Sequence, residues 1–247
     1  MIMQRALAVV AVTTAAASLA ACESTQETSK RLSKNAKKLL NAEGLKVTKQ
    51  NGQIKVSSTE SLSDANGTAV VVNLKNSGAT QLNVPIAIAV LGRKKKKLID
   101  NSLAGLDASL ISAAAVEKGT SFWVNNQLQT SSKPQSVNAK IGASTERPKG
   151  PLPKILLSKL SFKTDVSGIY YSGIITNKSK IVQKRLVVSC VSRVGGRLKA
   201  AGRAIVERLM PAPTPKPTPI RVYFIGNPTG GAMSCQAPPT TITGEAS

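Results

Sequence analysis

The sequence has 247 residues, of which 34 are lysine or arginine and 12 are aspartate or glutamate, and it contains no histidine. The net charge of +22 indicates attraction to anionic partners and says little about the fold. Without histidine the chain lacks the usual general base, the commonest zinc ligand and every Ser-His-Asp or Cys-His arrangement, so these classes of enzyme are excluded.

Residues 1–21 are the first predicted element, a signal peptide. An uncharged apolar run follows Arg5, and at about 1.5 Å per residue it is too short to cross a hydrocarbon core about 30 Å thick. The run ends in Leu-Ala-Ala-Cys, which resembles the lipobox of bacterial lipoproteins. The resemblance implies that Cys22 is acylated, becomes the mature N-terminus and anchors an exported protein to the outer face of the bacterial membrane. A plain signal peptide followed by a chance cysteine is the alternative.

A basic tether, residues 22–44, is predicted next. Removal of the signal peptide takes away only Arg5, so the mature chain keeps 33 basic and 12 acidic side chains. Five cations of the tether are candidates for contact with anionic headgroups near the lipid anchor: Lys30, Arg31, Lys34, Lys37 and Lys38. The tether is either a short juxtamembrane helix or a solvated spacer.

Residues 45–143 predict an all-β domain, an immunoglobulin-like β-sandwich. Residues 68–78 form a Val-rich run that ends in a turn, and residues 83–92 alternate in a way that buries one face of a strand. Further strands are expected at 118–126 and 136–143 and, from weaker runs, near Leu45, Ile54, Leu98 and Leu110. Seven or eight strands in about a hundred residues are typical of a sandwich.

The sharpest local feature of this region is Gly-Arg-Lys-Lys-Lys-Lys, residues 92–97, at an expected hairpin tip. Five consecutive cations form a candidate polyanion-binding patch suited to phosphate or sulfate polymers: Arg93, Lys94, Lys95, Lys96 and Lys97. A solvated turn whose lysines discourage edge-to-edge pairing of strands is the alternative.

Residues 144–153 contain three prolines and no apolar periodicity, and they predict a linker. Residues 154–247 then repeat the earlier pattern, since Asn177 lies 101 positions after Asn76 and Phe224 lies 102 positions after Phe122. The matching order and spacing predict a second sandwich, with a chance alignment of generic β patterns as the alternative.

The stretch 171–211 carries a family resemblance. Its Gly-x-x-x-Asn-x-Ser strand and turn lead to an alternating strand and a Gly-containing hairpin. This arrangement resembles the FxLYD-type immunoglobulin-like domains of bacterial exported proteins, and residues 45–143 resemble a more diverged copy. The resemblance implies two tandem sandwiches that serve as accessory or adhesive modules. The proline-rich stretch 211–219 is expected to be an extended loop between strands, either a docking peptide or a stiff connection.

The three cysteines fit this reading. With Cys22 acylated, Cys190 and Cys235 remain as a pair in an oxidising compartment, where a disulfide is expected. Two buried free thiols are the alternative.

No catalytic residue, metal site or cofactor is predicted. No serine is followed three positions later by a lysine, and no Asp-x-Asp loop occurs. The seven aromatic residues are too few to favour stacking on nucleic acid. The sequence therefore predicts a non-catalytic envelope lipoprotein that binds an anionic polymer or an acidic protein. An architectural spacer or assembly factor is the alternative, and an unrecognised hydrolase is less favoured.

Overall fold

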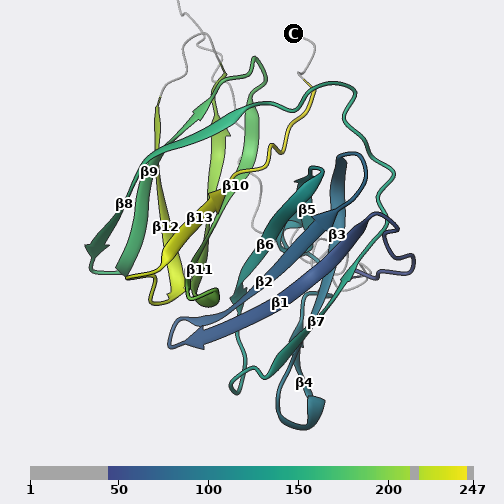
Figure 1. Cartoon of the computed structure of the whole chain (residues 1–247), viewed down its shortest axis with the longest axis vertical. Helices are drawn as coiled ribbons and strands as arrows, with labels where there is room; N and C mark the ends of the chain where they lie inside the picture. Colours follow the sequence, from purple (N-terminus) through teal and green to yellow (C-terminus); the bar gives the residue numbers. More distant parts are fainter. Residues whose placement is uncertain (1–43, 212–216, 244–247) are drawn as a thin grey trace, which may run out of the picture. The chain divides into compact units, whose positions relative to one another are not determined.

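The computed structural model describes residues 44–211 and 217–243, in which nearly all of the regular secondary structure is β-strand (Figure 1). This described part contains thirteen strands, two short 3-10 turns and no α-helix, so the prediction of an all-β fold is confirmed. The N-terminal half contains β1 (Ile54–Asp64), β2 (Gly67–Asn76), β3 (Gln81–Leu91), β4 (Lys97–Asp100), β5 (Ser112–Val116), β6 (Gly119–Leu128) and β7 (Ser136–Ile141). The C-terminal half contains β8 (Ile155–Asp165), β9 (Gly168–Asn177), β10 (Gln183–Val194), β11 (Arg197–Leu209), β12 (Thr218–Gly226) and β13 (Ala232–Gln236).

Two sheets form the N-terminal half. One has the strand order β1-β2-β6, and the other is centred on β3, which pairs with β4, β5 and β7. Alternate side chains of β3 point into the core, as its period-two pattern predicts: Val84, Ile86, Ile88 and Val90. The sequence of β2 is a continuous Val-rich run because both faces of this strand are buried.

Six strands form one sheet in the C-terminal half, in the order β13-β10-β11-β12-β9-β8. Strands from both ends of this sheet contribute to one apolar core. Ile175 of β9 and Leu186 of β10 are fully buried there, and Leu157 of β8 and Met233 of β13 pack against the same cluster. The outermost strands of the sheet therefore share one core.

The strand pairing of the N-terminal half recurs in the C-terminal half. Hairpin β1–β2 corresponds to β8–β9, and β2 pairs with β6 as β9 pairs with β12. The pairing of β3 with β7 corresponds likewise to that of β10 with β13. One difference is that β11 also pairs with β12, which joins all six strands of the C-terminal half into one sheet.

Local polar contacts also recur at the two hairpins. Asp64 accepts the backbone N–H of Asn66 at 2.7 Å, and Asp165 accepts that of Ser167 at 2.9 Å. The glycine that follows each turn has a positive φ, 138° in the first hairpin and 115° in the second. The same turn chemistry therefore closes both hairpins.

A buried asparagine ends the second strand of each hairpin. Asn76 ends β2 and Asn177 ends β9, and their side chains are 2% and 0% exposed. The Nδ2 of Asn76 donates to the carbonyl of Val116, the last residue of β5, at 3.0 Å. The Nδ2 of Asn177 donates to the carbonyl of Leu209, the last residue of β11, at 3.4 Å. Each asparagine thus ties its strand to a later one.

The prediction of a strand near Leu45 is wrong, because only an isolated bridge between Gln50 and Gly142 forms there. The chain turns at Asn51, whose Oδ1 accepts the backbone N–H of Ile54 at 2.9 Å, and regular pairing begins only after this turn.

The predicted linker, residues 144–153, contains no strand, but its first residues are held to β3. The hydroxyl of Ser144 donates to the carbonyl of Leu82 at 2.5 Å, and the N–H of Leu82 donates to the carbonyl of Glu146 at 3.1 Å. In the proline-rich stretch 211–219, residues 212–216 lie outside the described residues, and the last two belong to β12.

A third apolar cluster joins the two halves. It contains Ala69, Val71 and Val124 from the N-terminal half and Val191, Ala201 and Ile225 from the C-terminal half. Arg193 of β10 also forms an ion pair with Glu60 of β1, and Asp64 accepts the N–H of Gly226 at 2.7 Å. These contacts lie within one compact unit, to which all the described residues belong.

Candidate functional site

The predicted anchor region lies outside the described residues. This holds for Cys22 and for the five membrane-proximal cations Lys30, Arg31, Lys34, Lys37 and Lys38. In the part of the chain that the structure describes, no helix has the length and apolar character needed to cross a bilayer. Acylation of Cys22 therefore stays a prediction.

Residues 92–97, termed the basic hairpin, form the tip between β3 and β4, where the sequence places them. Two backbone hydrogen bonds hold the tip. The N–H of Gly92 donates to the carbonyl of Lys96 at 2.8 Å, and the N–H of Lys96 donates to the carbonyl of Arg93 at 3.1 Å. All five cations of the tip are exposed. They therefore project into solvent from an ordered backbone.

One of the five cations, Lys97, has an acidic partner. Its Nζ lies 2.8 Å from Oδ2 of Asp100, and Oδ1 of the same carboxylate accepts the N–H and hydroxyl of Ser102. The hydrogen bond from Lys97, supported by those from Ser102, lowers the pKa of Asp100 to about 2. Among the described residues, the other four cations form no ion pair with an acidic side chain. The tip therefore keeps most of its positive charge.

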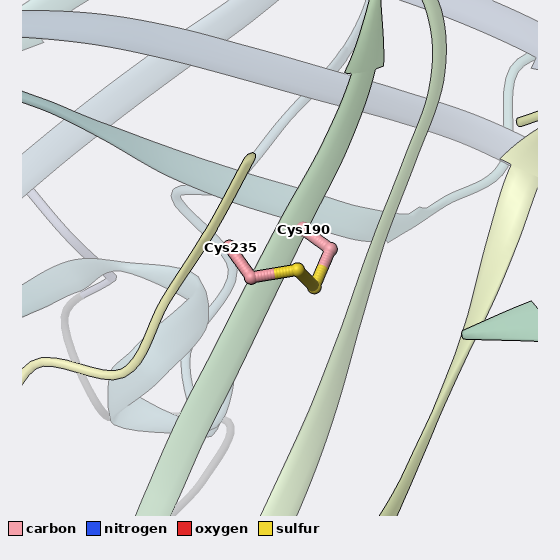
Figure 2. Close-up of a disulfide and its surroundings, with 2 residues drawn as sticks. All are labelled: Cys190 and Cys235. Atoms are coloured by element: carbon pink, nitrogen blue, oxygen red, sulfur yellow. A yellow bond between two sulfur atoms is a disulfide. The ribbon is translucent and has the colours of Figure 1, made fainter. Parts of the chain in front are cut away.

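The disulfide lies in the C-terminal half (Figure 2). Cys190 of β10 and Cys235 of β13 stand directly opposite one another in the antiparallel register, and the structure joins their sulfurs. Their Cα atoms are 4.2 Å apart, as in a closely spaced antiparallel pair. This is the pairing that the sequence predicts. Among the described strands, β13 pairs with β10 alone, and the bond attaches it covalently to the sheet.

A cleft of about 840 Å³ is the feature that sequence reasoning missed. Its walls come from β5, the start of β6, residues 152–155, the start of β10 and residues 236–240. Its volume lies in the range of ligand-binding sites, which occur preferentially where domains meet. The side chains that line it are mostly small or apolar, among them Phe122 and Trp123. Its cations are Lys118, Lys154, Lys184 and Arg185. Only the packing of distant segments creates this cleft, so no local motif predicts it.

A buried arginine lies beside the cleft. Arg203 of β11 is 7% exposed, and its cross-strand neighbour Ser189 and its hydrogen-bond partner Ser109 both line the cleft. Burial lowers the pKa of Arg203, while the nearby Asp107 acts in the opposite direction. Asp107 also forms an ion pair with Arg185, at 2.5 Å. These side chains bring charge into the junction between the two halves.

A side-chain contact crosses the cleft wall next to the disulfide. The amide of Gln236 of β13 bonds to the backbone of Phe122 in β6, accepting its N–H and donating to its carbonyl. A neighbouring strand would make the same two bonds. The outer edge of β6 therefore accepts an amide group from outside its own sheet.

Within residues 44–211 and 217–243, no group of three cysteine or acidic side chains is arranged to hold a metal ion. No family model matches the sequence, and no curated protein matches it either. The resemblances to the lipobox and to FxLYD-type domains therefore stay predictions.

Proposed function

We propose that the protein is a non-catalytic lipoprotein of the bacterial cell envelope that binds an anionic envelope polymer through the basic hairpin. In this proposal acylated Cys22 holds the chain at the outer face of the membrane. The two halves serve as tandem immunoglobulin-like modules of the FxLYD type. The observation that carries the proposal is the basic hairpin itself, a fixed tip with five exposed cations of which one is neutralised by a neighbouring acid.

The backbone of the tip supports a role for its side chains. Lys94 and Lys95 have φ angles of 53° and 58°, in the left-handed region that glycine adopts far more readily than lysine. A turn that only connected two strands would be less strained with glycine at these positions. Strain of this kind often accompanies functional sites, because the side chain is needed where the backbone is unfavourable.

Replacing Arg93–Lys97 with serine is the experiment that tests the proposal. At 50 mM salt we expect the affinity for heparin and for polyphosphate to fall roughly tenfold or more, and the slope of log K against log salt to fall by about 3 to 4. The melting temperature is expected to stay unchanged because the replaced side chains are exposed. Binding is measured by fluorescence anisotropy across a salt series.

A matched control removes the same charge elsewhere. Five scattered, exposed lysines are replaced with serine: Lys49, Lys55, Lys75, Lys133 and Lys163. If net charge alone attracts the polymer, this control loses as much affinity as the hairpin variant does, and the hairpin is not the site. A smaller loss in the control supports the proposal.

An architectural spacer is the second candidate function, and the junction between the halves favours it. Apolar packing and the ion pair between Arg193 and Glu60 join the halves, as a spacer of fixed length requires. This candidate predicts no polymer binding by either variant or by the unaltered protein.

A further inference from the structure

The outer edge of β6, the side that faces away from β2, extends past Phe122 to Thr120. The register of β6 against β2 is regular from Gly119 to Val124, so backbone groups of alternate residues point away from β2. Phe122 directs its N–H and carbonyl to Gln236, on the side away from β2. Thr120, two residues earlier, therefore directs its own N–H and carbonyl to the same side.

Thr120 has no backbone partner on that side. Neither its N–H nor its carbonyl forms a hydrogen bond outside the sheet with any described residue. Thr120 is exposed and lines the cleft, as Phe122 and Gln236 do. The cleft thus contains an open strand edge at Thr120. Two residues further along β6, at Phe122, the side-chain amide of Gln236 already occupies this edge.

Small side chains line another part of the cleft. Strand β5 has the sequence Ser-Ala-Ala-Ala-Val, and all five of its residues line the cleft. Small side chains leave space for the backbone of a bound segment to approach β6 at the strand spacing of about 4.8 Å. Bulky side chains would prevent this approach.

The charges around the cleft favour one sign of partner. Four cations line it, Lys118, Lys154, Lys184 and Arg185, against a single acid, Glu117. Arg185 is shared with Asp107 and Glu207, but Lys118 and Lys154 still outnumber Glu117 when Arg185 and Lys184 are left out of the count. An occupant with carboxylates fits this lining better than a neutral or basic one.

We propose that the cleft binds an extended acidic segment of a protein partner, which adds to the open edge of β6 at Thr120. In this mode the backbone of the segment forms with Thr120 the same two hydrogen bonds that the amide of Gln236 forms with Phe122. Its acidic side chains meet Lys118 and Lys154. The site is separate from the basic hairpin, so this proposal does not depend on polymer binding.

The test uses a fluorescent, end-blocked hexapeptide of alternating glutamate and valine, with the lysine–valine hexapeptide as its charge-reversed counterpart. The protein is the full chain with Arg93–Lys97 replaced by serine, so that the basic hairpin does not capture the acidic probe. We expect the acidic hexapeptide to bind and the basic one not to bind. Failure of the acidic hexapeptide to bind would overturn the proposal and leave the function of the hairpin untouched.

Thr120→Pro and Thr120→Val then separate backbone from side-chain contacts. Proline removes the outward N–H, and it is tolerated at a strand edge because no ladder hydrogen bond is lost. Valine keeps the N–H and the shape of the side chain. We expect Thr120→Pro to weaken binding at least tenfold and Thr120→Val to change it less than twofold. Equal affinities for these two variants would contradict strand addition.

A charge variant gives a second readout that does not depend on how Thr120→Pro folds. Lys118→Glu with Lys154→Glu alters two cleft-lining side chains and no strand residue. We expect this double variant to weaken binding of the acidic hexapeptide about tenfold while the melting temperature stays the same. Unchanged affinity would show that the cleft does not select an acidic segment.

Discussion

Removing the disulfide through Cys190→Ala and Cys235→Ala is expected to lower the free energy of unfolding by about 4 kcal/mol. The bond closes a loop with a sequence separation of 45 residues, which restricts the unfolded chain. It also attaches β13, which within the described part of the chain pairs only with β10. Alanine suits position 190 because that side chain lies fully in the core. Urea denaturation followed by far-UV circular dichroism measures the loss.

Chemical reduction provides the control for this prediction. Adding dithiothreitol to the unaltered protein should lower its denaturation midpoint to that of the double variant, and it should leave the double variant unchanged. A midpoint that reduction does not move would show that the sulfurs are not bonded in the native protein, or that the bond does not stabilise it.

The replacement Asn177→Ala is expected to lower the free energy of unfolding by about 3 kcal/mol. The side chain of Asn177 is fully buried, and its Nδ2 donates to the carbonyl of Ile181 at 2.7 Å. Its Oδ1 accepts both the N–H and the hydroxyl of Ser179, at 3.0 and 2.7 Å. Alanine removes these bonds together with the one to the buried carbonyl of Leu209, and a buried polar group that loses its partner costs more than the bond itself contributes. Urea denaturation measures this change too.

Two comparisons show whether the loss comes from this hydrogen-bond network. The adjacent, exposed replacement Lys178→Ala should change the free energy of unfolding by less than about 0.5 kcal/mol. Asn76→Ala, at the corresponding place in the N-terminal half, should cause a loss similar to that of Asn177→Ala. If Asn177→Ala costs no more than Lys178→Ala, the buried network is not what stabilises the turn.

Periodicity in the sequence predicted the strands that bury one regular face. The alternation in residues 83–92 corresponds to β3, and the Val-rich run 68–78 corresponds to β2. These strands are evident in the sequence because successive side chains of a strand point to opposite faces, so burial leaves a regular apolar pattern. The run near Leu45 lacks a regular alternation and a partner strand, and it forms only the bridge at Gln50.

Features that depend on distant contacts were not predictable from the sequence. The pairing of β11 with β12 and the cleft beside β5 and β6 arise only when separate segments pack together. The role of Gln236 also has no local signal, because its partner Phe122 lies 114 positions away. The cysteine pair was predictable because counting the thiols left a single pairing once Cys22 was assigned to the lipid.

The proposed export and acylation would place Cys190 and Cys235 in an oxidising compartment, where their disulfide is expected. Intact mass spectrometry of the protein from the membrane fraction, without reductant, tests this directly. The account predicts a chain that starts at Cys22, carries a diacylglycerol adduct and is two hydrogens lighter than its reduced form. A soluble chain that starts at Met1, with no lipid and with three reduced thiols, would contradict it.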